Sequence, residues 1–141
     1  MSVPSKPPEK TPREWLRYAK GDIDVAEREM AYTSPAYHTL CFLCQSAAEK
    51  FKGYLIAQSW PLKRTHDIVD LLGDCTQYDR TFNVLIPDGV ILNEYITQGR
   101  YPGDVAFEDI GPDEAQQALK AACRIRDVVL ARLSASTKRG G

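Results

Sequence analysis

The sequence predicts an all-α fold, an antiparallel up-and-down bundle of four to five helices. Apolar residues recur at three- and four-residue intervals in several segments, which is the spacing of one buried helix face. Helix-start signals precede these segments, and the connections between them are short. The chain has 141 residues, which suits one domain. We expect the helical domain to span residues 11–133, between disordered tails at residues 1–10 and 134–141.

The first expected helix starts at Thr11 and runs to about Ala31. Thr11 is a suitable N-cap, Pro12 occupies the first helical position, and Glu14 completes a capping box. The expected buried face comprises Trp15, Ala19, Ile23, Ala26 and Met30. Charged residues fill the other side, so this segment has the pattern of an amphipathic helix.

The second expected helix is the longest. Ser34 is its expected cap and Pro35 its first residue, and Pro61 is expected to end it. A wide apolar stripe is formed by Tyr37, Leu40, Cys41, Cys44, Ala47, Ala48, Phe51 and Leu55. A stripe of this width predicts a helix that is covered on more than one side.

The remaining helices are shorter or more interrupted. Thr65 is the expected cap of a third helix, and residues 79–97 are expected to form two helical pieces separated at Pro87. Pro112 opens the last helix, with acidic residues directly after it. Residues 98–111 contain several Gly and Pro residues and are expected to form a long loop, whose length indicates a functional role that the sequence does not specify.

Composition excludes several classes of protein. Apolar residues make up 43% of the chain, but none of their runs approaches the roughly 20 residues that a membrane helix needs. The N-terminus has no signal-peptide core, so we expect a cytoplasmic protein. The formal net charge of −1 argues against a dedicated non-specific nucleic-acid binder, since such proteins are usually basic.

Two of the four cysteines, Cys41 and Cys44, form a C-x-x-C pattern on the second helix. A zinc site needs about four ligands, and the sequence has no second pair. A redox motif needs a strand before the helix, which is not expected here. We therefore expect both thiols to pack in the core, and we expect no metal and no cofactor.

Other patterns with known chemistry are weak or missing. Asp22 and Asp24 could hold Mg²⁺, but residues two apart on a helix point in different directions, so a solvated face is the better interpretation. The sequence contains no nucleophile elbow and no Gly-rich phosphate loop. His38, near the start of the second helix, is expected on its exposed side.

One set of polar residues predicts a pocket for a nucleotide or another phosphate. Its candidate binding residues are Lys50, Lys52, Arg64, His66, Arg100 and Tyr101, and its supporting residues are Gln45, Glu49 and Asp104. Gln45 and Glu49 share a helix face. Arg64 and His66 flank the start of the third helix, whose free amides favour an anion. The alternative is scattered surface charge, and spacing alone does not decide between the two.

Two segments carry a family resemblance. They are Cys44-Gln45-Ser46-Ala47-Ala48-Glu49-Lys50-Phe51-Lys52-Gly53-Tyr54-Leu55 and Thr65-His66-Asp67-Ile68-Val69-Asp70-Leu71-Leu72. Supporting similarities are Trp15, Ala19, Asp22 and Ala26, Arg100-Tyr101-Pro102, and the Ala-rich last helix beginning near Glu114. Together they resemble the HEPN family of higher eukaryotes and prokaryotes, over about Trp15 to Leu133.

The resemblance implies an all-α bundle that commonly forms a homodimer, with a role connected to nucleotides or RNA. It also implies a minimal nucleotidyltransferase-type partner protein, in a toxin–antitoxin or defence pair. In such a module Arg100 and Lys50 would contact phosphate, Tyr101 would stack on a base, and His66 would adjust the site or cap its helix.

Some members of the family are metal-independent ribonucleases, which use an Arg and, roughly four to six residues later, a His for proton transfer. Here residues 104–107 read Asp-Val-Ala-Phe and no histidine follows His66. A binding module without nuclease activity is therefore the first hypothesis. The alternatives are a ribonuclease toxin that uses His66 with Arg64 or Arg100, and a purely structural dimerisation domain.

Overall fold

The computed structural model describes residues 10–61, 63–96 and 109–140, with side chains as far as residue 134. All regular structure in these ranges is helical, which confirms the predicted fold class. The elements are α1 (Pro12–Met30), α2 (Tyr37–Lys50), α3 (Gly53–Ala57), α4 (Ile68–Tyr78), the 3-10 helix η1 (Arg80–Leu85), α5 (Ile86–Asn93) and α7 (Pro112–Gly140).

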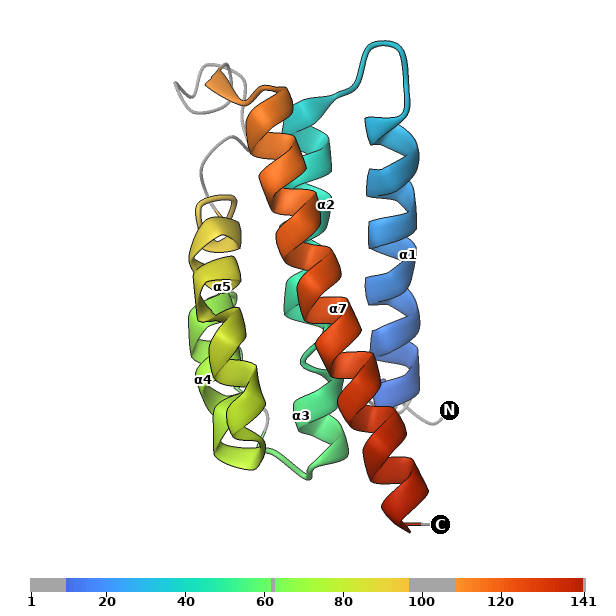
Figure 1. Ribbon diagram of the computed structural model, residues 1–141, viewed down its shortest axis with the longest axis vertical. Helices are drawn as coiled ribbons and strands as arrows, with labels where there is room; N and C mark the ends of the chain where they lie inside the picture. The colour runs from blue at the N-terminus through green and yellow to red at the C-terminus, as the bar shows by residue number, and fades with distance from the viewer. Residues whose placement is uncertain (1–9, 62, 97–108, 141) are drawn as a thin grey trace, which may run out of the picture.

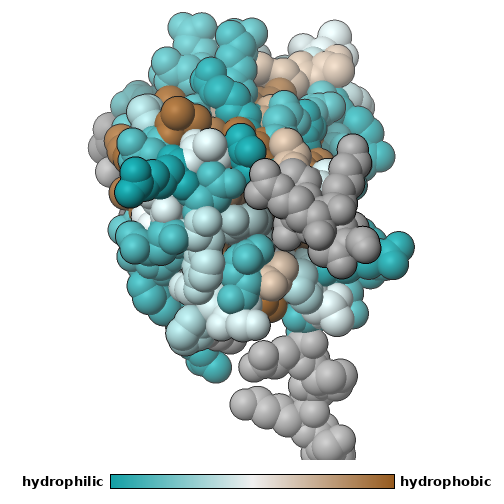
Figure 2. All heavy atoms as spheres, turned by 60° about the horizontal axis from the view of Figure 1, so that its bottom comes forward, coloured by the Kyte–Doolittle hydropathy of each residue, from teal (hydrophilic) through white to brown (hydrophobic). Residues whose placement is uncertain are grey.

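The helices form a bundle in which α2 is central. Figure 1 shows α1 and α2 side by side and antiparallel, α4 and α5 on the other side of α2, and α7 crossing the front of the bundle. The start of α1 and the end of α7 lie at the same end of the molecule (Figure 1). From this end, hydrophilic side chains cover most of the visible surface, with small separate hydrophobic areas between them (Figure 2).

Helix α1 follows the sequence closely. The Thr11 side-chain oxygen accepts a hydrogen bond from the Glu14 amide at 3.2 Å, so the predicted N-cap is present. Ala19, Ile23 and Ala26 are fully buried, and they are central members of the predicted apolar face. The helix ends one residue before Ala31.

Helix α2 differs from the prediction at both ends. It begins at Tyr37, not at Pro35, and the Ala36 amide donates to the Glu29 carboxylate at 2.7 Å, so a side chain of α1 binds an amide at its start. It ends at Lys50, and the chain turns before it resumes as α3. After this turn Gly53 packs against α1, where an added Cβ would lie 2.9 Å from the Pro12 carbonyl oxygen.

Beyond α3, boundaries shift by a few residues. Helix α4 starts at Ile68 with Asp67 as its N-cap, while the predicted cap Thr65 accepts a hydrogen bond from the Asp67 amide at 3.1 Å. Residues 80–93 form the expected two helical pieces, η1 and α5, with Pro87 in the first turn of α5.

Helix α7 starts at Pro112, as predicted, and the Gly111 amide donates to the Glu114 carboxylate at 3.0 Å. It extends to Gly140, whereas the sequence suggested a disordered tail from Ser134. Residues 134–139 contain neither Gly nor Pro, so nothing in their composition interrupts the helix before the final glycines.

The core divides into two parts with different packing. Buried small residues are concentrated on α1, α2 and α7, and we call this set the small-residue seam: Ala19, Ala26, Cys41, Cys44, Ala47, Ala48, Ala115, Ala118, Ala121 and Ala122. Larger side chains fill the side of α4, η1 and α5, where the Phe82 ring lies 4.6 Å from that of Tyr54. Small residues allow helix axes to approach closely.

The C-x-x-C cysteines belong to the seam, as predicted. Cys41 and Cys44 are both fully buried. Burial raises the pKa of the Cys41 thiol to about 11 and that of Cys44 further still. Both therefore remain protonated thiols and act as small apolar core residues.

Among the described residues, no helix is long and apolar enough to cross a membrane.

Candidate functional site

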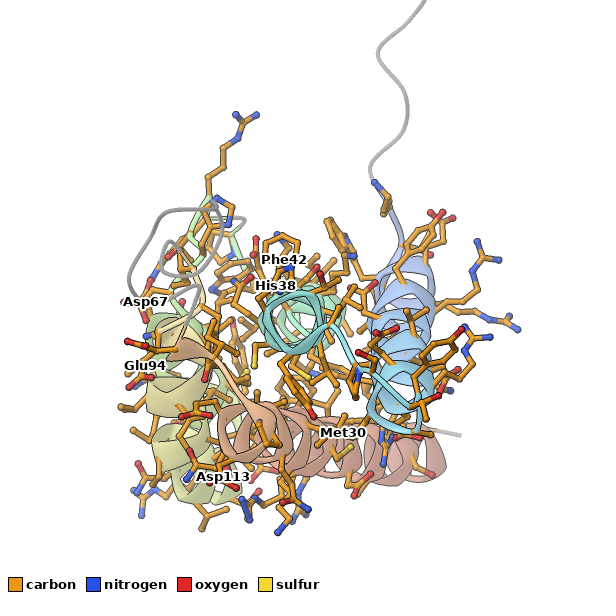
Figure 3. The ribbon with its side chains drawn as sticks, turned by 90° about the horizontal axis from the view of Figure 1, so that it is seen from above. Met30, His38, Phe42, Asp67, Glu94 and Asp113 are labelled. Carbon is orange, nitrogen blue, oxygen red and sulfur yellow. The ribbon has the colours of Figure 1, made fainter. Side chains whose placement is uncertain are left out.

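The candidate site lies on the outer face of α2, which we define by His38, Phe42, Gln45 and Glu49. Steps of three and four residues align these side chains on one side of the helix. Seen along α2, His38 and Phe42 point away from α7, between α1 on one side and α4 with α5 on the other (Figure 3). Phe42 is 40% exposed, so this side of α2 is only partly covered by protein.

A polar cluster joins the outer face of α2 to the start of α4. The Glu49 carboxylate lies 2.9 Å from Nδ1 of His66, and its other oxygen accepts a hydrogen bond from the Gln45 amide group at 3.3 Å. Gln45 is 1% exposed, whereas the His66 side chain is 69% exposed. A buried amide therefore orients a carboxylate, and the carboxylate orients an imidazole that faces solvent.

The first amides of α4 are bound by the protein itself. The Ile68 amide donates to the Asn93 side chain at 2.7 Å, and the Asp70 amide donates to the Asp67 carboxylate at 3.0 Å. Asn93 also donates to Asp67 at 2.8 Å, and this hydrogen bond, together with the α4 amides, lowers the pKa of Asp67. The expectation of free amides here is wrong, because Asp67 and Asn93 take the place of an external anion.

Lys50 faces the opposite flank of α2. Its Nζ lies 2.7 Å from the Asp22 carboxylate of α1, which also accepts a hydrogen bond from the Ser46 hydroxyl at 3.0 Å. The Asp22 side chain is only 19% exposed. The interpretation of both carboxylates as a solvated face therefore holds for the exposed Asp24 and is wrong for Asp22, which ties α1 to α2.

The other candidate residues are distributed differently. The Lys52 ammonium lies over the Trp15 ring at 4.5 Å from its centroid, a cation–π contact. Arg64 is exposed, two residues before His66. Arg100, Tyr101 and Asp104 lie outside the described residues. Apart from Arg64, the described candidates thus form three local groups around Glu49, Asp22 and Trp15.

The polar cluster of Gln45, Glu49 and His66, with the start of α4, forms a corner between α2 and α4. Two further residues of this corner, Asp67 and Asn93, were not among the predicted site residues. Asp67 had a readable signal, because an Asp followed three residues later by Asp70 is a common helix start. Asn93 had none, since its partners are more than twenty residues away in the chain. In the described part of the chain, no three His, Cys, Asp or Glu side chains are grouped as a metal site.

Comparison with known proteins places this bundle in a family. The HEPN domain matches residues 12–133, so the chain belongs to the HEPN family. A search of curated proteins found no match.

Two crystal structures are similar over nearly their whole length. One is ST0689, an archaeal HEPN homologue, with 26% identity, a TM-score of 0.72, and coverage of 88% of this chain and 98% of that one. The other is TT1696 from Thermus thermophilus, with 27% identity, a TM-score of 0.72, and coverage of 85% of this chain and 96% of that one. The resemblance stated from the sequence is thereby confirmed.

Proposed function

We propose that this chain is a cytoplasmic HEPN-type binding module without nuclease activity. It takes the phosphate of a nucleotide or of RNA at the corner between α2 and α4, as a homodimer. It also pairs with a minimal nucleotidyltransferase-type protein in a toxin–antitoxin or defence system. Family membership supports this class of function, and the arrangement around His66 supports the location.

The observation that carries the proposal is the Glu49–His66 pair. A carboxylate bound to Nδ1 fixes the orientation of the ring and turns the second ring nitrogen away from Glu49, toward a ligand. In an imidazolium both ring nitrogens are donors. The His66 side chain is mostly exposed, while Glu49 is mostly covered. A donor held in this way suits an oxygen of a phosphate group.

Two further cations belong to the proposed site. Arg64 is exposed in the segment that leads to His66. Asn93 binds the start of α4, and Arg100 follows it by seven residues in the sequence. In the proposal Arg100 binds a phosphate and Tyr101 stacks on a base. Lys50 is bound to Asp22, so it contributes to the site only by positioning α2.

The test is native mass spectrometry of the purified protein with ATP, GTP or a short RNA. We expect Arg64→Ala, His66→Ala and Arg100→Ala each to weaken binding about ten- to a hundredfold, because a charged hydrogen bond contributes roughly 1.5–3 kcal/mol. Lys63→Ala is the matched control, since Lys63 is in the same segment but forms ion pairs with Asp70 and Asp74. Equal loss in the control, or none in the three variants, would refute the proposed site.

A metal-independent ribonuclease is the second candidate, and the same pair favours it. An imidazole oriented by a carboxylate can act as a general base toward a ribose hydroxyl. Arg64 would then stabilise charge on the phosphate. RNA cleavage that disappears in both His66→Ala and Glu49→Gln would establish this activity. Cleavage that survives His66→Ala would remove the residue from any catalytic role.

A further inference from the structure

The outward side of α1 carries an unusual row of exposed apolar side chains. Tyr18, Val25 and Tyr32 are 43%, 42% and 68% exposed, and they recur every seven residues. A seven-residue repeat keeps side chains on one side of a helix and is the spacing of helix pairs that pack along their length. The first two lie on α1, and the third follows Ala31, the C-cap of that helix. This row together with Glu14, Gly21 and Arg28 is the α1 stripe.

Gly21 lies at the centre of the α1 stripe. It is exposed, and a Cβ added there would have no neighbour within 4 Å. Packing within the single chain therefore gives no reason for a glycine in the middle of α1. In a helix interior glycine is less favourable than alanine by about 0.8–1.0 kcal/mol. A glycine at this point allows the backbone of another helix to approach closely.

Charges and apolar groups are placed symmetrically about Gly21. Glu14 lies seven residues before it and Arg28 seven residues after it, while Tyr18 and Val25 lie three before and four after. Glu14 and Arg28 are exposed, and within the described chain neither forms an ion pair. Two α1 stripes that cross antiparallel at Gly21 would set each Glu14 against an Arg28 and each Tyr18 against a Val25.

We propose that the α1 stripe is the contact between two copies of this chain. The pairing is isologous, because the same surface meets itself across a two-fold axis. It rests on the homodimer of the proposed function and names the surface that forms it. A hollow of about 680 Å³ adjoins Gly21 between α1 and α7, and its lining combines Leu16 and Leu130 with the charged Arg13, Arg17, Lys20 and Asp24.

The first test uses glycine substitutions and sedimentation velocity over a range of concentrations. Gly21→Leu places a side chain at the crossing point, so we expect it to raise the dimer dissociation constant at least about a hundredfold while the fold stays at least as stable as before. Gly73→Leu is the matched control, because Gly73 is also helical and a Cβ there also meets nothing within 4 Å. It is expected to leave the dimer intact.

The second test uses charge exchange. Glu14→Arg and Arg28→Glu are each expected to weaken the dimer about tenfold, since every reversal acts twice across a two-fold axis. The double variant with both changes is expected to restore it, because the pairs are re-formed with opposite signs.

A dimer that tolerates Gly21→Leu would overturn the α1 contact and leave the homodimer itself standing. A wild-type monomer at all concentrations would overturn both. Neither result would affect nucleotide binding, which is measured separately with the Arg64 and His66 variants. Loss of nucleotide binding with an intact dimer would instead leave this inference in place.

Discussion

The small-residue seam and the corner between α2 and α4 are both built on α2, but they are held together by different forces. In the seam, fully buried side chains such as Ala47 and Cys44 contribute through close packing alone. In the corner, Gln45, Glu49 and His66 are held by directional polar contacts, and one of them faces solvent. The comparison teaches that one helix can combine close apolar packing on one face with a directional polar network on another.

The largest expected effect is in the core beside the seam. Leu40 on α2 is fully buried, so Leu40→Ala leaves a cavity and should lower the free energy of unfolding by about 2–5 kcal/mol. Urea denaturation followed by circular dichroism measures this change. A loss below about 1 kcal/mol would mean that the helices around α2 collapse into the space.

The next effect concerns the close contact of α3 with α1. Gly53→Ala places a Cβ 2.9 Å from the Pro12 carbonyl oxygen and 3.1 Å from Trp15 Cβ, and the first of these is backbone. We expect a destabilisation of about 1–3 kcal/mol from overpacking, although alanine favours helices. Thermal unfolding of this variant beside Gly73→Ala, whose added Cβ meets nothing, isolates the steric part. Equal melting temperatures would contradict the contact.

A smaller effect is expected at the start of α4, and it depends on pH. The hydrogen bonds from Asn93 and from α4 amides lower the pKa of Asp67 below its ordinary 3.8. The stabilisation is therefore complete above about pH 4 and is lost as pH falls through the lowered value. Asp67→Ala removes the cap, for about 0.5–2 kcal/mol at neutral pH. The difference between wild type and variant should shrink in acid, and a constant difference would argue against a charged cap.

The smallest effect on stability is expected at His66 itself. Exposed ion pairs contribute about 0–1 kcal/mol, so His66→Ala should change the unfolding free energy by less than about 1 kcal/mol. Binding of nucleotide should fall far more than this change would explain. Unfolding and binding measured on the same preparation separate the two regions, and a large loss of stability would place His66 with the structural residues.

Local signals predicted much of the fold. Thr11 with Pro12 marked the start of α1, and Pro112 marked the start of α7, because caps and prolines act within a few residues. The end of α2 escaped prediction, because the apolar pattern continues through Phe51 to Leu55 and the turn depends on contact with α1. The start of α2 escaped for the same reason, since Glu29 of α1 binds its first amide.

The candidate site was predictable only in part. Gln45 and Glu49 were expected on one helix face, and their side chains do make contact. The partners of Lys50 and Lys52 depend on how α1 and α2 are rotated relative to each other, which spacing within one helix does not determine. Arg100, Tyr101 and Asp104 lie outside the described residues, so their predicted roles remain proposals.

Two consecutive residues of α2 contact residues on different sides of the helix: Glu49 contacts His66, and Lys50 contacts Asp22 of α1. One residue corresponds to about 100° of helix rotation, so a single insertion in α2 before Glu49 would turn both away from their partners together. Substitutions can alter either contact alone, but a change in length cannot. The length of α2 is therefore expected to vary far less among related chains than the residues on its outer face.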